Sequence, residues 1–161
     1  MRRLASCWTL LSAAAAVLAV LGTTRWASAA ANSGEVELTR EAKSAIQLAQ
    51  QYMASQQRAD GSFGSSHNAS PGIVAAGVMG WLVNGSLPGE GPYGKQVAKG
   101  VDYILTCAQP SGYFAKAGQG TMYEHALATI CLAEVWGQTQ DKRLYDKLKK
   151  AVDLIIRCQN D

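Results

Sequence analysis

The residues best suited to chemistry lie together at the start of an apolar segment. Tyr123, Glu124 and His125 are consecutive and follow the hydroxyl residue Thr121. A histidine at the mouth of a cavity could act as a general base or as a polar anchor. The competing interpretation is structural: Glu124 completes a capping box with Thr121, and His125 is satisfied at the helix end.

Glu134 and Trp81 are the other candidates for a pocket, and each lies in an apolar segment. A carboxylate within an apolar helix must find a partner or line a cavity, unless it lies close enough to the helix end to reach solvent. Trp81 suits a packed core as well as a pocket. Whether a site can form therefore depends on how the helices are arranged that carry the five candidates Trp81, Tyr123, Glu124, His125 and Glu134.

Two kinds of helix alternate along the chain. Segments beginning near residues 39, 95 and 142 carry apolar residues at helical spacing and polar residues elsewhere, which predicts amphipathic helices. In the first segment the shared face consists of Ala42, Ala45, Ile46, Ala49, Tyr52, Met53 and Gln56. Segments 73–83 and 126–136 are apolar nearly all round, which predicts helices buried on all sides.

Local signals place the ends of these helices. Thr39 and Ser70, the latter followed by a proline, are expected N-caps, and Thr121 with Glu124 forms a capping box. Gly85 and Gly137 are expected to end the two apolar helices, because glycine accepts the left-handed conformation found there.

The chain repeats itself at a spacing of 51 residues. Tyr52, Tyr103 and Leu154 are equivalent, Gly61 matches Gly112, and Phe63 matches Phe114. Repeats of paired helices predict hairpins stacked side by side, as a curved ring or as a flat solenoid. We expect repeats over about 39–94, 95–141 and 142–161, which is about 2.5 copies.

These residues resemble the repeat of the prenyltransferase and squalene-hopene cyclase family. The family motif runs from a basic residue through an aromatic residue and a glutamine to a glycine and a second aromatic residue. Its matches here are Tyr52, Gln57, Gly61 and Phe63; then Tyr103, Gln109 (one residue late), Gly112 and Phe114; then Gln159. The resemblance covers residues 40–161 and implies an all-α fold, an α/α toroid with amphipathic helices outside and apolar helices inside.

The resemblance does not extend to the family's catalytic residues. The cyclases' Asp-x-Asp-Asp run is missing from the sequence, and Asp102 and Cys107 do not have the spacing of the prenyltransferase zinc ligands. His67 and His125 have no paired ligands at metal spacing. We therefore expect no cofactor and no metal.

The N-terminus is typical of a secretory signal peptide. Two arginines precede an apolar run over 9–22, and Ala27-Ser28-Ala29 is an A-x-A cleavage site. We expect a signal peptide over 1–29, a linker over 30–38, a repeat domain over 39–161, and an exported, periplasmic or secreted protein that is not transmembrane after cleavage.

Composition is consistent with a folded exported domain. The 161 residues include 15 basic and 12 acidic ones, for a net charge of +3, but cleavage after Ala29 would remove three arginines and no acids. A neutral mature chain argues against nucleic-acid binding. Cys107, Cys131 and Cys158 would be free, buried thiols, since adjacent helix axes lie about 8–10 Å apart.

Two functions follow from the sequence. The first is a non-catalytic helical scaffold that binds a protein or a cell-envelope partner. The alternative is isoprenoid binding, of squalene or polyprenyl type, or a cyclase-like enzyme whose catalytic part lies outside this chain. A closed ring of about six units needs roughly 300 residues. We therefore expect a half-ring or a truncated product that self-associates or needs a C-terminal half.

Overall fold

A computed structural model describes residues 37–64, 69–116 and 120–159 of the chain. The predicted signal peptide, the linker up to residue 36, and His67 lie outside the described residues. Thr39–Asp161 forms one compact unit, and the description below concerns that unit alone.

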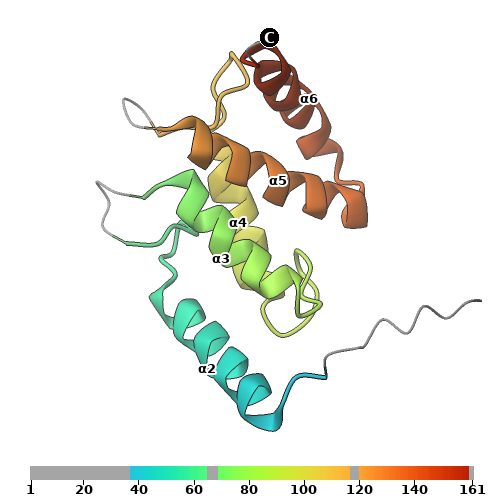
Figure 1. The fold of residues 1–161 in the computed structure, drawn as a ribbon. Helices are drawn as coiled ribbons and strands as arrows, with labels where there is room; N and C mark the ends of the chain where they lie inside the picture. The colour runs from blue at the N-terminus through green and yellow to red at the C-terminus, as the bar shows by residue number, and fades with distance from the viewer. Residues whose placement is uncertain (1–36, 65–68, 117–119, 160–161) are drawn as a thin grey trace, which may run out of the picture. The chain divides into compact units, whose positions relative to one another are not determined.

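The described residues are all-α, as expected, with five helices and no named strand (Figure 1). The helices are α2 (Arg40–Gln56), α3 (Pro71–Leu82), α4 (Gly94–Thr106), α5 (Met122–Thr139) and α6 (Lys142–Arg157). None of these described helices is long and apolar enough to cross a membrane.

Helix starts agree with the sequence prediction because the caps are local. The Thr39 hydroxyl accepts from the Ala42 N–H at 3.2 Å, and the Ser70 hydroxyl accepts from the Gly72 N–H at 3.1 Å. The capping box at the start of α5 is complete. Each side chain satisfies a backbone N–H group that the first helical turn leaves without a partner.

The end of α5 differs from the prediction. Gly137 lies inside the helix, and the left-handed residue is Gln140, with a φ of 53°. Asp141 directly follows it as the N-cap of α6 and accepts from the Arg143 N–H at 2.9 Å. Only Gln140 and Asp141 separate α5 from α6. The left-handed position that ends α5 therefore falls on Gln140 and not on a glycine.

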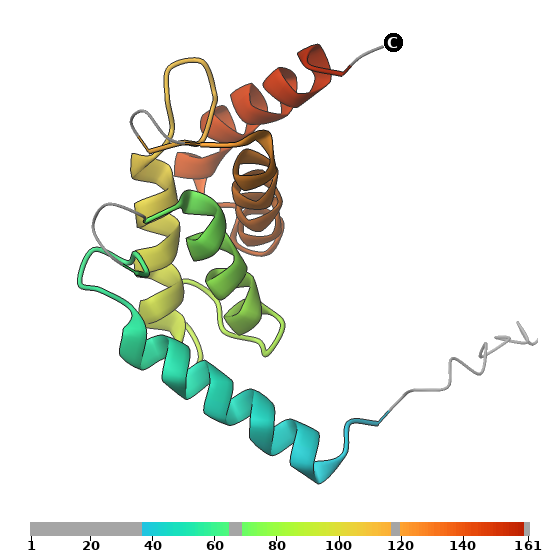
Figure 2. The same cartoon turned by 60° about the vertical axis from the view of Figure 1, so that its left-hand side comes forward.

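Helix α3 is the centre of the unit. It packs against α4 and α5, while α5 also packs against α6 (Figures 1 and 2). The core between them is built from fully buried side chains of α3, α4 and α5, namely Val74, Val78, Trp81, Val97, Ile104, Leu132 and Val135. Helix α2 also packs against α3, over a smaller contact.

Two burial predictions were wrong. On α2, Ala45, Ile46, Ala49, Tyr52 and Gln56 are exposed, and Gln50 is the buried residue instead. The apolar helices are not buried all round, since Ile73 on α3 is 56% exposed and Ile130 on α5 is 53% exposed. Helical periodicity identifies residues that share a face, but burial requires another element opposite that face.

Candidate functional site

The polar cluster at the start of α5 is used by the fold itself. The Glu124 carboxylate accepts from the Thr121 N–H at 2.9 Å, and the Thr121 hydroxyl accepts from the Glu124 N–H at 3.3 Å. Tyr123 is 73% exposed and lies on the surface of α5. Glu124 thus acts as a capping residue in the described fold.

His125 is fully buried and does not line a mouth, so the structural interpretation, a histidine satisfied near the helix end, agrees with the structure. Its Nδ1 accepts from the Phe114 N–H at 3.1 Å, and Nε2 lies 3.3 Å from the Ala151 carbonyl oxygen. The proton therefore belongs on Nε2, which donates to that carbonyl. Burial lowers the pKa of His125 and favours this neutral form. The ring joins the loop before α5 to α6.

Glu134 and Trp81 lie in different environments. Glu134 is exposed on α5, so no buried carboxylate site is formed by it. Trp81 is fully buried in α3, and its indole N–H donates to the Gln50 carbonyl at 3.4 Å. The Gln50 amide in turn donates to the Gly80 carbonyl at 2.8 Å. Sequence reasoning missed Gln50, since it is one of several glutamines along α2.

The two glycine turns have the same structure at a spacing of 51 residues. Gly61 and Gly112 have φ angles of 88° and 93°, in the left-handed region. An added Cβ would lie 2.1 Å from the Lys99 carbonyl oxygen at Gly61, and 2.5 Å from that of Lys150 at Gly112. Each turn therefore packs directly on the backbone of the next amphipathic helix, where a side chain has no room.

The hydrogen bonds within the two turns match as well. The Arg58 N–H donates to the Ser62 carbonyl at 2.9 Å, and the Gln109 N–H donates to the Tyr113 carbonyl at 2.9 Å. Arg58 and Gln109 are 51 residues apart, so Gln109 is equivalent to Arg58. The assignment of Gln109 to the position of Gln57 is therefore wrong.

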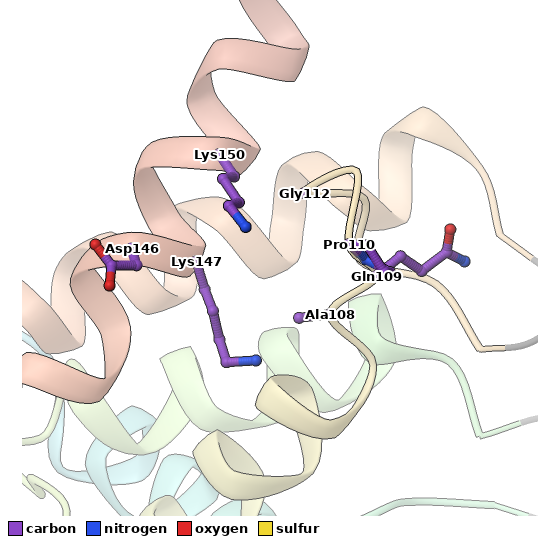
Figure 3. A pocket seen from close by; sticks show the side chains of 7 residues that line it. All are labelled: Ala108, Gln109, Pro110, Gly112, Asp146, Lys147 and Lys150. Atoms are coloured by element: carbon purple, nitrogen blue, oxygen red, sulfur yellow. The ribbon is translucent and has the colours of Figure 1, made fainter.

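The position equivalent to Gln57 is Ala108, whose methyl group cannot make the hydrogen bonds of the Gln57 amide. A hollow lies beside Ala108. The Gln57 amide donates to the carbonyls of Gly61 at 3.2 Å and Gln96 at 2.9 Å, which ties the first turn to α4. At the second turn Gln109 points away from α6 (Figure 3). A hollow of about 240 Å³ lies there, lined by Ala108, Gln109, Pro110, Gly112, Asp146, Lys147 and Lys150.

The remaining motif residues are structural where they are buried. Phe114 is fully buried, and Phe63 packs against Trp81 with ring centroids 6.0 Å apart. The Tyr103 hydroxyl donates to the Ala69 carbonyl at 2.7 Å, and burial raises its pKa to about 12. Its equivalent Tyr52 is 66% exposed. Gln159, the motif residue of the expected third repeat, is exposed after the end of α6.

A second hollow, of about 310 Å³, lies between α5 and α6. Apolar side chains dominate its lining, which consists of Trp136, Tyr145, Leu148, Lys149, Val152 and Asp153. The ring centroids of Trp136, near the end of α5, and Tyr145, near the start of α6, lie 5.8 Å apart. His125, near the start of α5, contacts Ala151 further along α6. The two helices therefore run antiparallel.

Several apolar side chains of α5 and α6 are exposed to solvent, and we call this set of residues the α5–α6 face. It consists of Tyr123 and Ile130 on α5 and Tyr145, Val152 and Ile156 on α6, each at least 41% exposed. Contiguous exposed apolar surface marks an interaction site more often than isolated exposed apolar residues do.

All three cysteines in the described ranges are free, as expected, but only two are buried. Cys107 and Cys131 are buried, whereas Cys158 is exposed at the end of α6. Burial raises the pKa of the Cys131 thiol to about 12. Among the described residues no group of three or more His, Cys, Asp and Glu side chains could hold a metal ion.

Comparison with known proteins gives no relative from which a function could be transferred: no family model matches the chain, and neither curated proteins nor solved structures show significant similarity.

Proposed function

We propose that this chain is an exported, non-catalytic helical-repeat scaffold that binds an apolar helix of a protein partner. In this proposal the repeats form part of an α/α toroid, with about 2.5 copies of 51 residues. The observation that carries it is the exposed α5–α6 face. The polar candidates Glu124 and His125 are both engaged in holding the fold.

The internal spacing supports an apolar helix as the ligand. Position 79 on α3 is equivalent to Ile130, and position 101 on α4 is equivalent to Val152. Val101 is only 1% exposed and shares a core cluster with Leu132 and Val135 of α5, whereas Val152 is 41% exposed. Val152 is thus exposed where its equivalent Val101 lies in the core.

A labelled peptide with the sequence of residues 120–140 tests this function, because α5 supplies Leu132 and Val135 to the core cluster that contains Val101. Fluorescence anisotropy on dilute full chain should show saturable binding. Ile130→Glu and Val152→Glu should each weaken it about tenfold or more, since binding would bury a charge without a partner.

Val83→Glu is the matched control. Val83 follows α3 directly as its C-cap and is 82% exposed, and its equivalent 51 residues later is Glu134. This variant adds the same charge outside α5 and α6 and should bind the peptide as the unmodified chain does. Absence of saturable binding, or an equal loss in Val83→Glu, would refute the scaffold function.

A second function, isoprenoid binding, is favoured by the hollow of about 310 Å³ beside Trp136. Its lining of aromatic and aliphatic side chains suits a squalene-like or polyprenyl chain. Extraction of the purified chain followed by mass spectrometry tests it: a bound isoprenoid that is lost in Val152→Glu supports this function, and an extract without isoprenoid counts against it.

A further inference from the structure

We propose that the hollow at the second turn binds the side-chain amide of a glutamine from a polypeptide partner. The first turn of the same chain holds such an amide internally, since Gln57 donates both to its own turn and to α4. The hollow lies between the second turn and α6, and none of its lining residues belongs to the α5–α6 face. Binding at this hollow would therefore be separate from binding at that face.

The acceptors that hold Gln57 have equivalents at the hollow. Gln57 donates to the carbonyls of Gly61 at 3.2 Å and of Gln96 at 2.9 Å. The residues 51 positions later are Gly112 and Lys147, and both line the hollow. The two turns share their backbone conformation, with glycine φ angles of 88° and 93°. An amide placed in the hollow can therefore donate to the same two kinds of carbonyl.

The hollow has room for an amide group, because Ala108 supplies none. Its volume of about 240 Å³ is well above the roughly 10–15 Å³ that a single water molecule requires. Helix α6 carries Ala151 where α4 carries Gly100. A Cβ at Gly100 would lie 3.7 Å from Nε2 of Gln57, which is an ordinary contact distance. The methyl group of Ala151 is thus compatible with an amide at the equivalent place.

The charges around the hollow favour a neutral ligand that both donates and accepts. Lys147 and Lys150 extend from α6 towards the turn (Figure 3). The Lys147 ammonium lies 3.5 Å from the Leu105 carbonyl oxygen, whereas Lys150 is exposed and can donate to an amide oxygen. A cationic ligand would be repelled by both lysines. A carboxylate could pair with them, but its oxygens would face the carbonyl oxygens of Gly112 and Lys147. A carboxamide carries two N–H donors and one oxygen acceptor, which suits both sets of groups.

Nuclear magnetic resonance on the isotope-labelled full chain, titrated with N-acetylglutamine N-methylamide, tests the site. Saturable shifts should appear at the backbone N–H groups around the hollow, in the millimolar range that a few hydrogen bonds can supply. The glutamate and methionine counterparts have the same backbone and should bind about tenfold more weakly or worse. Glutamate lacks the N–H donors, and methionine lacks a strong donor and a strong acceptor.

Three variants locate the site. Ala108→Gln supplies the amide from the chain itself, so the shifts at the second turn should be lost. Gln57→Ala removes the amide at the first turn, so a second set of shifts should appear around Gly61. Gln109→Ala is the matched control and should bind as the unmodified chain does, because Gln109 points away from α6. Circular dichroism checks that each variant keeps its helices.

Three results would overturn the inference. They are the absence of saturable shifts around the hollow, equal binding of the glutamate compound, which would indicate an anion site formed by the lysines, and binding that persists in Ala108→Gln. The comparison of the three compounds uses the unmodified chain, so it holds even where a substitution alters folding. Failure at this hollow would leave the peptide experiment on the α5–α6 face unaffected, because the two sets of residues are separate.

Discussion

Replacing Ala108 by glutamine should strengthen the joint between the second turn and α6. Gln57 supplies two hydrogen bonds at the equivalent place in the first turn, to the carbonyls of Gly61 and Gln96. The equivalent carbonyls are those of Gly112 and Lys147, and both residues line the hollow beside Ala108. The amide of Ala108→Gln should therefore reach the same two kinds of acceptor.

The expected gain is a balance of three contributions to the free energy of unfolding. Two hydrogen bonds contribute about 0.5–1.5 kcal/mol each. Two partly buried methylene groups add up to about 0.8 kcal/mol each. Ordering a glutamine side chain costs about 1.5–2 kcal/mol. The net is a stabilisation of about 1 kcal/mol. For Gln57→Ala, which leaves two acceptors unpaired, we expect a loss of about 2 kcal/mol.

Urea unfolding followed by circular dichroism measures both changes, and Gln109→Ala is the control. Gln109 is exposed and points away from α6, so its replacement should change stability by less than about 0.5 kcal/mol. The reasoning would be refuted if Ala108→Gln destabilised the fold while Gln109→Ala did so too, because Gln109 would then hold the position of Gln57.

Two further predictions concern buried titratable groups. The pKa of His125 is lowered by burial, so the unfolded chain binds a proton below pH 6.5 that the folded chain does not. Stability should be complete above pH 6.5 and fall as the pH drops towards the folded pKa, by at most about 1.4 kcal/mol per pH unit. Urea unfolding should show a smaller pH slope in His125→Val, which carries the residue found 51 positions earlier; an unchanged slope would assign the effect to other groups. A disulfide reagent at pH 8 should modify Cys158 quickly, and Cys107 and Cys131 only on unfolding, since burial raises the pKa of both thiols. Blocked Cys107 and Cys131 in the unfolded, unreduced chain would contradict this.

Local features could be read from the sequence with success. The caps at Thr39, Ser70 and Thr121 are each formed by a side chain and a backbone N–H two or three residues away. Such contacts do not depend on the rest of the fold, so the sequence predicts them directly. The end of α5 was missed because it depends on the next helix: Asp141 must begin α6, and Gln140 takes the turn conformation that Gly137 was expected to supply.

Burial was harder to predict because it depends on distant parts of the chain. Tyr52 and Tyr103 are tyrosines at equivalent positions, yet Tyr52 is 66% exposed and Tyr103 is buried. Tyr103 lies against the segment before α3 and donates to Ala69, whereas Tyr52 has no such neighbour among the described residues. His125 could not be recognised as a buried joint either, since its partners Phe114 and Ala151 lie 11 and 26 residues away.

The glutamine of the repeat motif shows why residue type alone can mislead. If the two repeats are aligned by residue type, Gln109 becomes the equivalent of Gln57, with a shift of one residue. The backbone hydrogen bonds indicate Ala108 instead, because the Gln109 N–H makes the same bond as the Arg58 N–H. Gln109 is therefore equivalent to Arg58, and the preceding residue, Ala108, is equivalent to Gln57. Spacing had already favoured Ala108, since every other matched position is 51 residues from its partner. A fixed spacing reflects the stacking geometry of whole units, which a single side chain cannot shift. The missing glutamine therefore marks a weaker joint, and we expect the contact between the second turn and α6 to open before the contact between the first turn and α4.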